Sequence, residues 1–149
     1  MLKNVKKILV PIDFSDNSQK VFTAAANVAL KFGAELVSIF VVQSFEDHSG
    51  FFVPHMPVLQ FQEEMQGSAE KKMTAFLAEN LPAGLAGNGK VVVGDVGEEI
   101  VAFAKQEKID MIVMGTHGYK GLERVLFGSV AEQVVKTASC PVLTVNPCR

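Results

Sequence analysis

The sequence has little material for covalent or metal-bound crosslinks. Its 149 residues include only two cysteines, Cys140 and Cys148. They flank a segment that we interpret as the last strand, and an extended segment of this length would hold them too far apart for a disulfide. No Cys-x-x-Cys pair and no Cys/His spacing of a metal site occurs. We therefore expect two free thiols, one packed near a helix end and one on a loose terminus, and no metal site built from protein side chains.

Long apolar runs and an excess of positive charge are also absent. The apolar run after the lysine-containing start of the chain is too short for a signal-peptide core or a membrane span. The formal net charge is −2, and no basic face is evident, which argues against a nucleic-acid partner. We expect a cytoplasmic protein without a nucleic-acid or membrane partner. The length and the 48% apolar content predict a single domain over residues 1–149.

What the sequence does contain is an alternation of short apolar strands and longer amphipathic helices. The predicted strands are Lys7–Ile12, Leu36–Val42, Lys90–Val93, Ile109–Met114 and Val142–Val145. The predicted helices lie between them: one capped by Ser15, Asp16 or Ser18 and ended by Gly33, then Val58–Asn80, Glu98–Glu107, and one that begins at Ser129. Strict alternation implies an α/β fold with a parallel sheet, right-handed crossovers and helices on both faces.

A period of 3.6 residues predicts which face of each helix is buried. The predicted buried sets are Val21, Phe22, Ala25, Val28, Ala29 and Phe32; Met65, Ala69, Met73, Phe76 and Leu77; and Val130, Ala131, Val134, Val135 and Ala138.

Three segments between these elements are predicted as irregular. Gln43–Pro57 carries unexpected apolar residues, so it either covers a pocket, forms a dimer surface, or folds back onto the core. Leu81–Gly89 is predicted as a glycine-containing loop. Its spacing matches most of a Walker A motif, but Val91 replaces the magnesium-binding Ser or Thr and the segment precedes a strand. Gly94–Gly97 is predicted as a turn.

The glycines after the fourth predicted strand suggest an anion site. Gly115, Gly118 and Gly128 let the backbone approach an anion closely, and Ser129 begins a helix whose unpaired N–H groups point to the same space. The alternative is that two of these glycines are turn residues and that Gly128 and Ser129 are an ordinary helix start. The glycines alone favour neither interpretation.

The pattern Gly115-x2-Gly118-x9-Gly128-Ser129 resembles the nucleotide-binding signature of the universal stress protein family, in its ATP-binding subgroup. The likeness extends to Ile8–Ser15, which resembles the first strand and the adenosine-contacting aspartate of the family, and to Cys140–Val145. The resemblance implies an open five-stranded sheet of order 3-2-1-4-5, a Rossmann-like fold similar to that of adenine nucleotide alpha hydrolases. In that order, strands one and four are neighbours at the switch point where ligands bind.

The resemblance also implies the ligand and its contacts. ATP, accompanied by Mg²⁺ that phosphates and water coordinate, would be the ligand. The implied contacts are Asp13 to the ribose; Pro11, Ile12 and Val41 to the adenine, with Val41 acting through its backbone; Met114 under the sugar or base; and Gly115, His117, Gly118, Gly128, Ser129 and Val130 to the phosphates. The alternative to a ligand-binding role for Asp13 is that it is a helix cap or a turn residue.

The implied function is that of an ATP-binding regulatory module of the stress response. The family pairs its last strands between subunits, so we expect a homodimer through Val142–Val145 and an unknown protein partner. No catalytic residues are assigned, because Asp13–Ser18 lacks the Ser-Gly-Gly-x-Asp-Ser signature of related hydrolases. The chain is more consistent with a binding protein than with an enzyme. Two alternatives stay open: a stress protein that binds no nucleotide and acts only through dimer or partner contacts, and a slow ATP hydrolase that uses His117.

Overall fold

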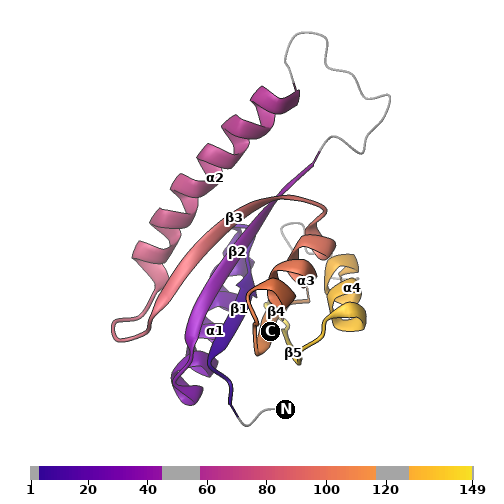
Figure 1. The fold of residues 1–149 in the computed structure, drawn as a ribbon. Helices are drawn as coiled ribbons and strands as arrows, with labels where there is room; N and C mark the ends of the chain where they lie inside the picture. The colour runs from indigo at the N-terminus through magenta and orange to yellow at the C-terminus, as the bar shows by residue number, and fades with distance from the viewer. Residues whose placement is uncertain (1–3, 45–57, 117–127, 149) are drawn as a thin grey trace.

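A single parallel sheet organises the molecule. The computed structural model describes residues 4–44, 58–116 and 128–148. In chain order the elements are β1 (Lys7–Pro11), α1 (Asp16–Phe32), β2 (Glu35–Gln43), α2 (Val58–Asn80), β3 (Gly87–Gly94), α3 (Val96–Gln106), β4 (Met111–Gly115), α4 (Ser129–Thr137) and β5 (Val142–Val145). All strand pairs are parallel and the order is β3-β2-β1-β4-β5 (Figure 1). The predicted fold class and strand order are confirmed.

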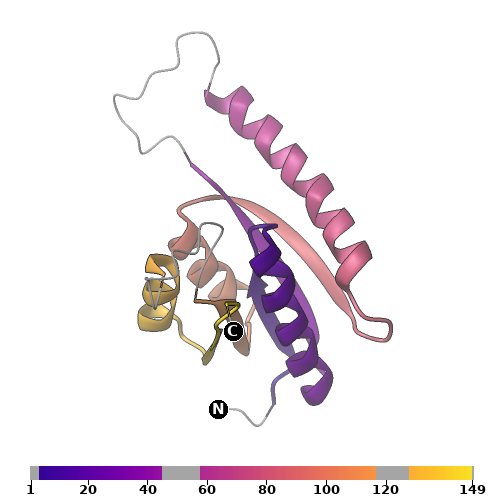
Figure 2. The same cartoon turned by 180° about the vertical axis from the view of Figure 1, so that it is seen from behind.

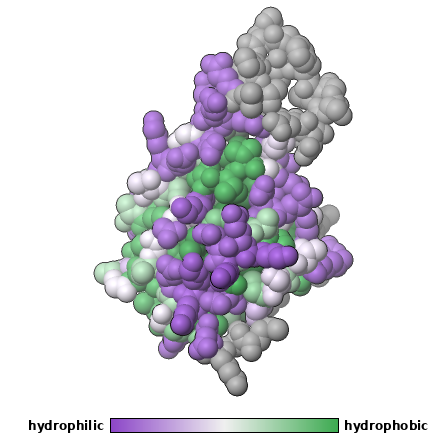
Figure 3. All heavy atoms as spheres, viewed as in Figure 1, coloured by the Kyte–Doolittle hydropathy of each residue, from purple (hydrophilic) through white to green (hydrophobic). Residues whose placement is uncertain are grey.

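The sheet has a buried core on each of its faces. Helices α1 and α2 cover one face and α3 and α4 cover the other (Figures 1 and 2). Along β1, Ile8 and Val10 belong to the core under α1 and α2, whereas Leu9 belongs to the core under α3 and α4. Because both faces are covered, the central strands carry apolar residues toward both faces instead of alternating apolar and polar residues. The outer side of α3 carries hydrophilic residues (Figure 3).

The N-terminal part of β3 differs from the prediction. The predicted loop extended through Gly89, but β3 begins at Gly87, and Gly89 pairs with Ser38 of β2. A Cβ at Gly89 would lie 2.3 Å from Cγ of Met73, so this glycine lets α2 pack closely on the strand. The prediction failed because glycine is disfavoured in strands unless tertiary packing requires it.

The predicted turn at Gly94–Gly97 is also shorter in the structure. Gly94 ends β3, and Asp95 caps α3 by accepting a hydrogen bond from the backbone N–H of Glu98 at 3.1 Å. Gly97 therefore lies inside the helix. A capping aspartate followed by acidic residues in the first turn is a helix-start pattern, and it moves the boundary upstream.

The predicted helix faces are correct at their centres and wrong at their edges. Phe22, Ala25 and Ala29 of α1 are buried, whereas Phe32, the last residue of the helix, is 44% exposed. Met65 of α2 and Val135 of α4, at 37% and 46%, are exposed in the same way. Periodicity identifies an apolar stripe, but it does not show how much of the stripe the sheet covers.

Both cysteines are free thiols, with Cys140 half-buried and Cys148 exposed. Burial, and to a smaller extent the nearby charge of Asp110, raises the pKa of the Cys140 thiol. Within the described ranges, none of the helices combines the length and apolar character needed to cross a membrane. The same residues contain no group of three or more His, Cys, Asp and Glu side chains placed to hold a metal ion.

Candidate functional site

Strands β1 and β4, which are neighbours in the sheet, separate at their carboxyl ends. Strands β1 and β4 pair at only two positions, Ile8 with Met111 and Leu9 with Ile112. Beyond Leu9, β1 continues beside β2, and β4 continues beside β5 as far as Gly115. The strand order reverses at this point, so the separation opens a crevice where parallel sheets bind their ligands.

Pro11 contributes to this separation. The backbone N–H of Ile12 donates to the carbonyl of Ile39 in β2 at 2.9 Å. Successive residues of a parallel strand bond to opposite neighbours, so the nitrogen of Pro11 lies on the β4 side. Proline has no N–H to donate there, and the β1–β4 ladder does not continue.

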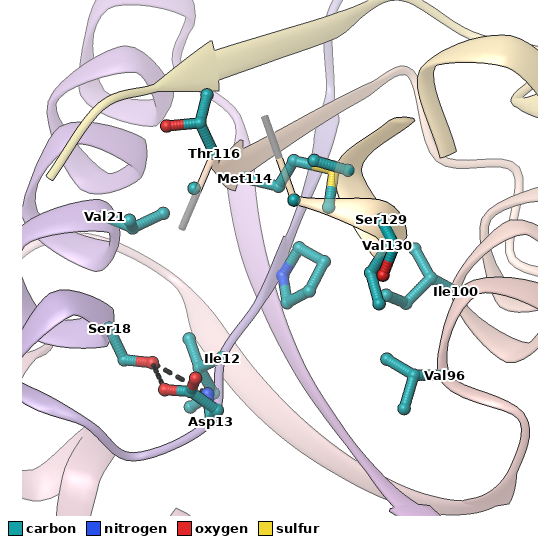
Figure 4. Close-up of a pocket in the computed structure, with 14 residues that line it drawn as sticks. Ile12, Asp13, Ser18, Val21, Val96, Ile100, Met114, Thr116, Ser129 and Val130 are labelled. Carbon is teal, nitrogen blue, oxygen red and sulfur yellow. Dashed lines mark hydrogen bonds between the residues drawn. The ribbon is translucent and has the colours of Figure 1, made fainter. Parts of the chain in front are cut away.

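A cavity of about 310 Å³ lies at the separation (Figure 4). Eight of the residues implied by the family resemblance line it: Pro11, Ile12, Asp13, Met114, Gly115, Gly128, Ser129 and Val130. The structure therefore brings together two segments that lie about a hundred residues apart in the chain. Val41 does not line the cavity, because it is packed in the core beneath α3 and α4. His117 and Gly118 lie outside the described residues, as do residues 45–57 of the Gln43–Pro57 loop.

Other lining residues were not predicted from the sequence. They are Ser18 and Val21 of α1, Val96 and Ile100 of α3, Thr116, and Ala131 of α4. Ser18 had a signal, since it lies in the polar run after β1 and is a candidate cap. Val96 and Ile100 had none, because no motif surrounds them and the crossover that brings α3 to the site is visible only in three dimensions. In Figure 4 these two side chains face Asp13 and Ser18 across the cavity.

A local hydrogen-bond network fixes the carboxylate of Asp13. Ser18, which is 5% exposed, accepts from the Asp13 backbone N–H at 2.7 Å and donates from Oγ to Asp13 Oδ1 at 2.6 Å. The N–H of Ser15 donates to the same Oδ1 at 3.0 Å, and its hydroxyl donates there as well. Within the described part of the chain, no hydrogen bond reaches Oδ2. One oxygen of the carboxylate is therefore occupied locally and the other can accept from a ligand.

The structure shows which residue caps α1. Ser15 is the N-cap residue, and its side chain accepts from the Ser18 N–H at 3.3 Å. Asp13 lies two residues before the cap and forms an Asx-type turn with Ser15. It is thus a turn residue, but it is not the helix cap.

The start of α4 supplies backbone donors on another side of the cavity. The first intrahelical bond joins the N–H of Glu132 to the carbonyl of Gly128 at 2.9 Å. The N–H groups of residues 129–131 precede it and so have no partner inside the helix. Gly128, the N-cap, provides no side-chain cap. These groups and the positive end of the helix dipole form an arrangement that favours an anion.

Relatives of this chain share its fold throughout. A family model described as the universal stress protein family matches residues 4–146. The universal stress protein MJ0531 of Methanocaldococcus jannaschii is 41% identical over 145 residues, which span 95% of this chain and 82% of that protein. The universal stress protein UspA of Lactobacillus plantarum has a solved structure that superposes with a TM-score of 0.79 at 29% identity, covering 96% of this chain and 99% of that one.

A more distant structure has the same fold. The universal stress protein of Archaeoglobus fulgidus in complex with dAMP has a TM-score of 0.68 at 22% identity, and the alignment covers 96% of this chain and 99% of that chain. The family model, the close relative and the shared strand order agree, and this chain belongs to the universal stress protein family.

Proposed function

We propose that this protein binds ATP in the crevice between β1 and β4 and acts as a regulatory, nucleotide-binding module of the stress response. One observation carries the proposal: the accepting oxygen of Asp13 and the open N–H groups at the start of α4 line a single cavity. A hydrogen-bond acceptor suits sugar hydroxyls, and a helix N-terminus suits phosphates. A nucleotide presents both groups at opposite ends of one molecule.

Each part of the ligand has a chemically suitable partner. Oδ2 of Asp13 would accept from ribose hydroxyls, and Pro11, Ile12 and Met114 would pack against the adenosine. The N–H groups of residues 129–131 would donate to phosphate oxygens. Backbone contact of Val41 with the adenine, phosphate contacts of Gly115, His117 and Gly118, and Mg²⁺ held by phosphates and water belong to the same proposal. The A. fulgidus protein holds dAMP, so the fold can accommodate an adenine nucleotide in at least one protein.

Regulation, with little or no catalysis, completes the proposal. The side chains that line the described cavity offer one carboxylate and three hydroxyl groups, and no histidine, lysine or second carboxylate is among them. Strand β5 is at the sheet edge, where Leu143 is 42% exposed. Pairing of two β5 strands would cover this edge and form a homodimer. Nucleotide binding would then bias the surface that this dimer presents to a partner protein.

The direct test is to denature the purified, unsupplemented protein, identify any released nucleotide, and titrate the nucleotide-free protein with Mg²⁺–ATP in a calorimeter. We expect ATP in the extract or saturable binding in the titration. Gly118→Val should weaken that binding, because a branched side chain would crowd the phosphates. Absence of binding at millimolar ATP would reject the proposal and favour a stress protein that acts through dimer contacts alone.

Sedimentation of the same preparation at micromolar concentration tests the assembly. A monomer with and without ATP would contradict the homodimer. Turnover of ATP should be slow, and unchanged turnover in His117→Ala would dismiss a hydrolytic role for that residue.

A further inference from the structure

Phe14 has an unusual backbone conformation beside the cavity. Its φ is 65°, in the left-handed region, and it is one of only two non-glycine residues with positive φ in the described ranges. A side chain with a Cβ disfavours this region, so the conformation persists only where the surroundings impose it. Phe14 lies between Asp13 and Ser15, whose hydrogen bonds fix the carboxylate that faces the cavity.

The surroundings that hold Phe14 are aromatic rings from two other elements. Its ring centroid lies 4.8 Å from that of Phe40 in β2 and 6.0 Å from that of Phe76 in α2. The ring of Phe76 also meets that of Phe22 in α1, edge to face, at 5.2 Å. The contact is not a hydrophobic staple within α1, because the helix position that would form one is Gln19. The ring of Phe14 is instead anchored on α2 and the sheet.

We infer that Phe14 is a positioning residue for the Asp13 carboxylate, and that its contact with Phe76 couples the packing of α2 to the ligand cavity. The rings keep Phe14 in the left-handed conformation. That conformation sets the turn in which Ser15 and Ser18 donate to Oδ1 of Asp13, leaving Oδ2 for a ligand. Coupling of this kind is reciprocal, so a ligand that fixes Asp13 also strengthens the docking of α2.

Helix α2 offers a matched position for comparison. Met73 is buried on the same face of the helix, one turn before Phe76, and lies over Gly89 of β3. Met73→Leu alters the contact of α2 with β3 at Gly89, whereas Phe76→Leu removes the ring contacts with Phe14 and Phe22. Only Phe76→Leu removes the aromatic contact with Phe14, so the two variants separate a local effect on Asp13 from a general loosening of the helix.

The first measurement is amide hydrogen exchange of the ligand-free protein. The relevant amides are those of Asp13, which donates to Ser18 Oγ, and Ser15, which donates to Asp13 Oδ1. In Phe76→Leu we expect both to exchange about twofold to tenfold faster relative to the core amide of Val113, the range expected for one aromatic contact. In Met73→Leu the ratio should stay unchanged. Equal changes in the two variants would overturn the inference.

A double-mutant cycle tests the route through Phe14. Phe14→Asn removes the ring but tolerates the left-handed conformation. In this background Phe76→Leu should have no further effect on exchange at Asp13 and Ser15. A full further effect would show that Phe76 acts by another route and would overturn the inference. Phe40→Leu, on the sheet side of the same ring, provides a second variant if Phe76→Leu folds poorly.

The ligand measurement rests on the proposed function. Affinities for ATP and for 2′,3′-dideoxy-ATP, which lacks both ribose hydroxyls, are compared in wild type, Phe76→Leu and Met73→Leu. We expect Phe76→Leu to weaken the affinity for ATP about twofold to tenfold and to leave the affinity for the dideoxy analogue unchanged. Equal weakening of both ligands would overturn the inference. If wild type binds neither ligand, the proposed function fails, and the exchange measurements still decide the role of Phe14.

Discussion

The carbonyl oxygen of Thr116 accepts a hydrogen bond of 2.8 Å from the backbone N–H of Gly128, although residues 117–127 separate the two in the chain. The N–H of Thr116 in turn donates to the carbonyl of Val145, at the end of β5, at 2.9 Å. The end of β4, the edge strand and the start of α4 are thus joined through one residue. This junction holds the first N–H groups of α4 at the cavity.

Replacing Ser129 with proline tests whether those N–H groups bind the phosphates. Proline is well tolerated at the first position of a helix, and the extended conformation of Gly128 (φ −68°, ψ 153°) suits a residue that precedes proline. Ser129→Pro removes one N–H and the hydroxyl, whereas Ser129→Ala removes the hydroxyl alone. We expect a loss of about tenfold or more in ATP affinity for proline and a smaller loss for alanine, measured by calorimetry.

Circular dichroism of the proline variant is the control, and it should show an unchanged helical content. Equal affinities of the proline and alanine variants would mean that the Ser129 N–H does not contact the ligand.

Much of this fold follows from sequence patterns with simple physical causes. Apolar runs of four to eight residues, separated by amphipathic stretches, are typical of parallel strands covered by helices. The prediction that two distant segments of the chain meet at the site came from the strand order that the family resemblance implies. Asp13 follows β1 and Gly115 ends β4, and these two strands are neighbours in the order that was predicted and found.

The features that were missed depend on tertiary contacts. Gly87 and Gly89 have low strand propensity, and they lie in β3 because side chains of Met73, Leu77 and Leu81 occupy the space a Cβ would need. Val96 and Ile100 line the cavity only because a crossover places α3 there. No local pattern encodes either relationship.

A pair of glycine substitutions measures the first of these effects. Gly89→Ala places a Cβ 2.3 Å from Cγ of Met73, so α2 must shift or Met73 must change rotamer. We expect a loss of about 1–3 kcal/mol in the free energy of unfolding. Gly67→Ala, in α2, meets no atom within 4 Å and should instead stabilise by about 0.5–1 kcal/mol. Urea denaturation of both variants provides the values, and a stable Gly89→Ala would contradict the close packing of α2 on β3.

The two cysteines should differ in reactivity. The thiolate is the nucleophile, and burial, aided by Asp110, raises the pKa of Cys140, whereas Cys148 is exposed. At about pH 8 iodoacetamide should therefore modify Cys148 first, as mass spectrometry with a Cys148→Ser control would show. Faster modification of Cys140 would contradict its burial.

The raised pKa of Cys140 also has a consequence for stability. Below the ordinary thiol pKa of about 8.5, the thiol is protonated in both the folded and the unfolded chain, and it adds no pH dependence. Above this pH the unfolded chain ionises first, so the free energy of unfolding should fall as pH rises through the folded pKa. Cys140→Ser should reduce this slope in urea denaturation at pH 7–10, and an identical slope would contradict the pKa shift.

Two buried serines should respond in opposite directions to replacement by alanine. Ser38, in β2, is fully buried, and its hydroxyl has no hydrogen-bond partner in the described structure. Ser18 is also buried, but its hydroxyl both accepts from and donates to Asp13. Ser38→Ala removes a desolvated, unsatisfied group and should stabilise by about 1 kcal/mol, whereas Ser18→Ala leaves the Asp13 N–H without its acceptor and should destabilise by about 1–2 kcal/mol.

Thermal denaturation gives both values, because about 1 kcal/mol corresponds to a shift of about 2–4 °C in Tm for a domain of this size. Ser18→Ala should also weaken ATP binding, since the carboxylate of Asp13 loses a donor that orients it. Ser38→Ala should leave ATP affinity unchanged, because Ser38 is not among the residues that line the cavity. Destabilisation by Ser38→Ala comparable to that by Ser18→Ala would show that the Ser38 hydroxyl has a partner. Stability and affinity together thus separate a serine that only packs in the core from one that positions the acceptor at the site.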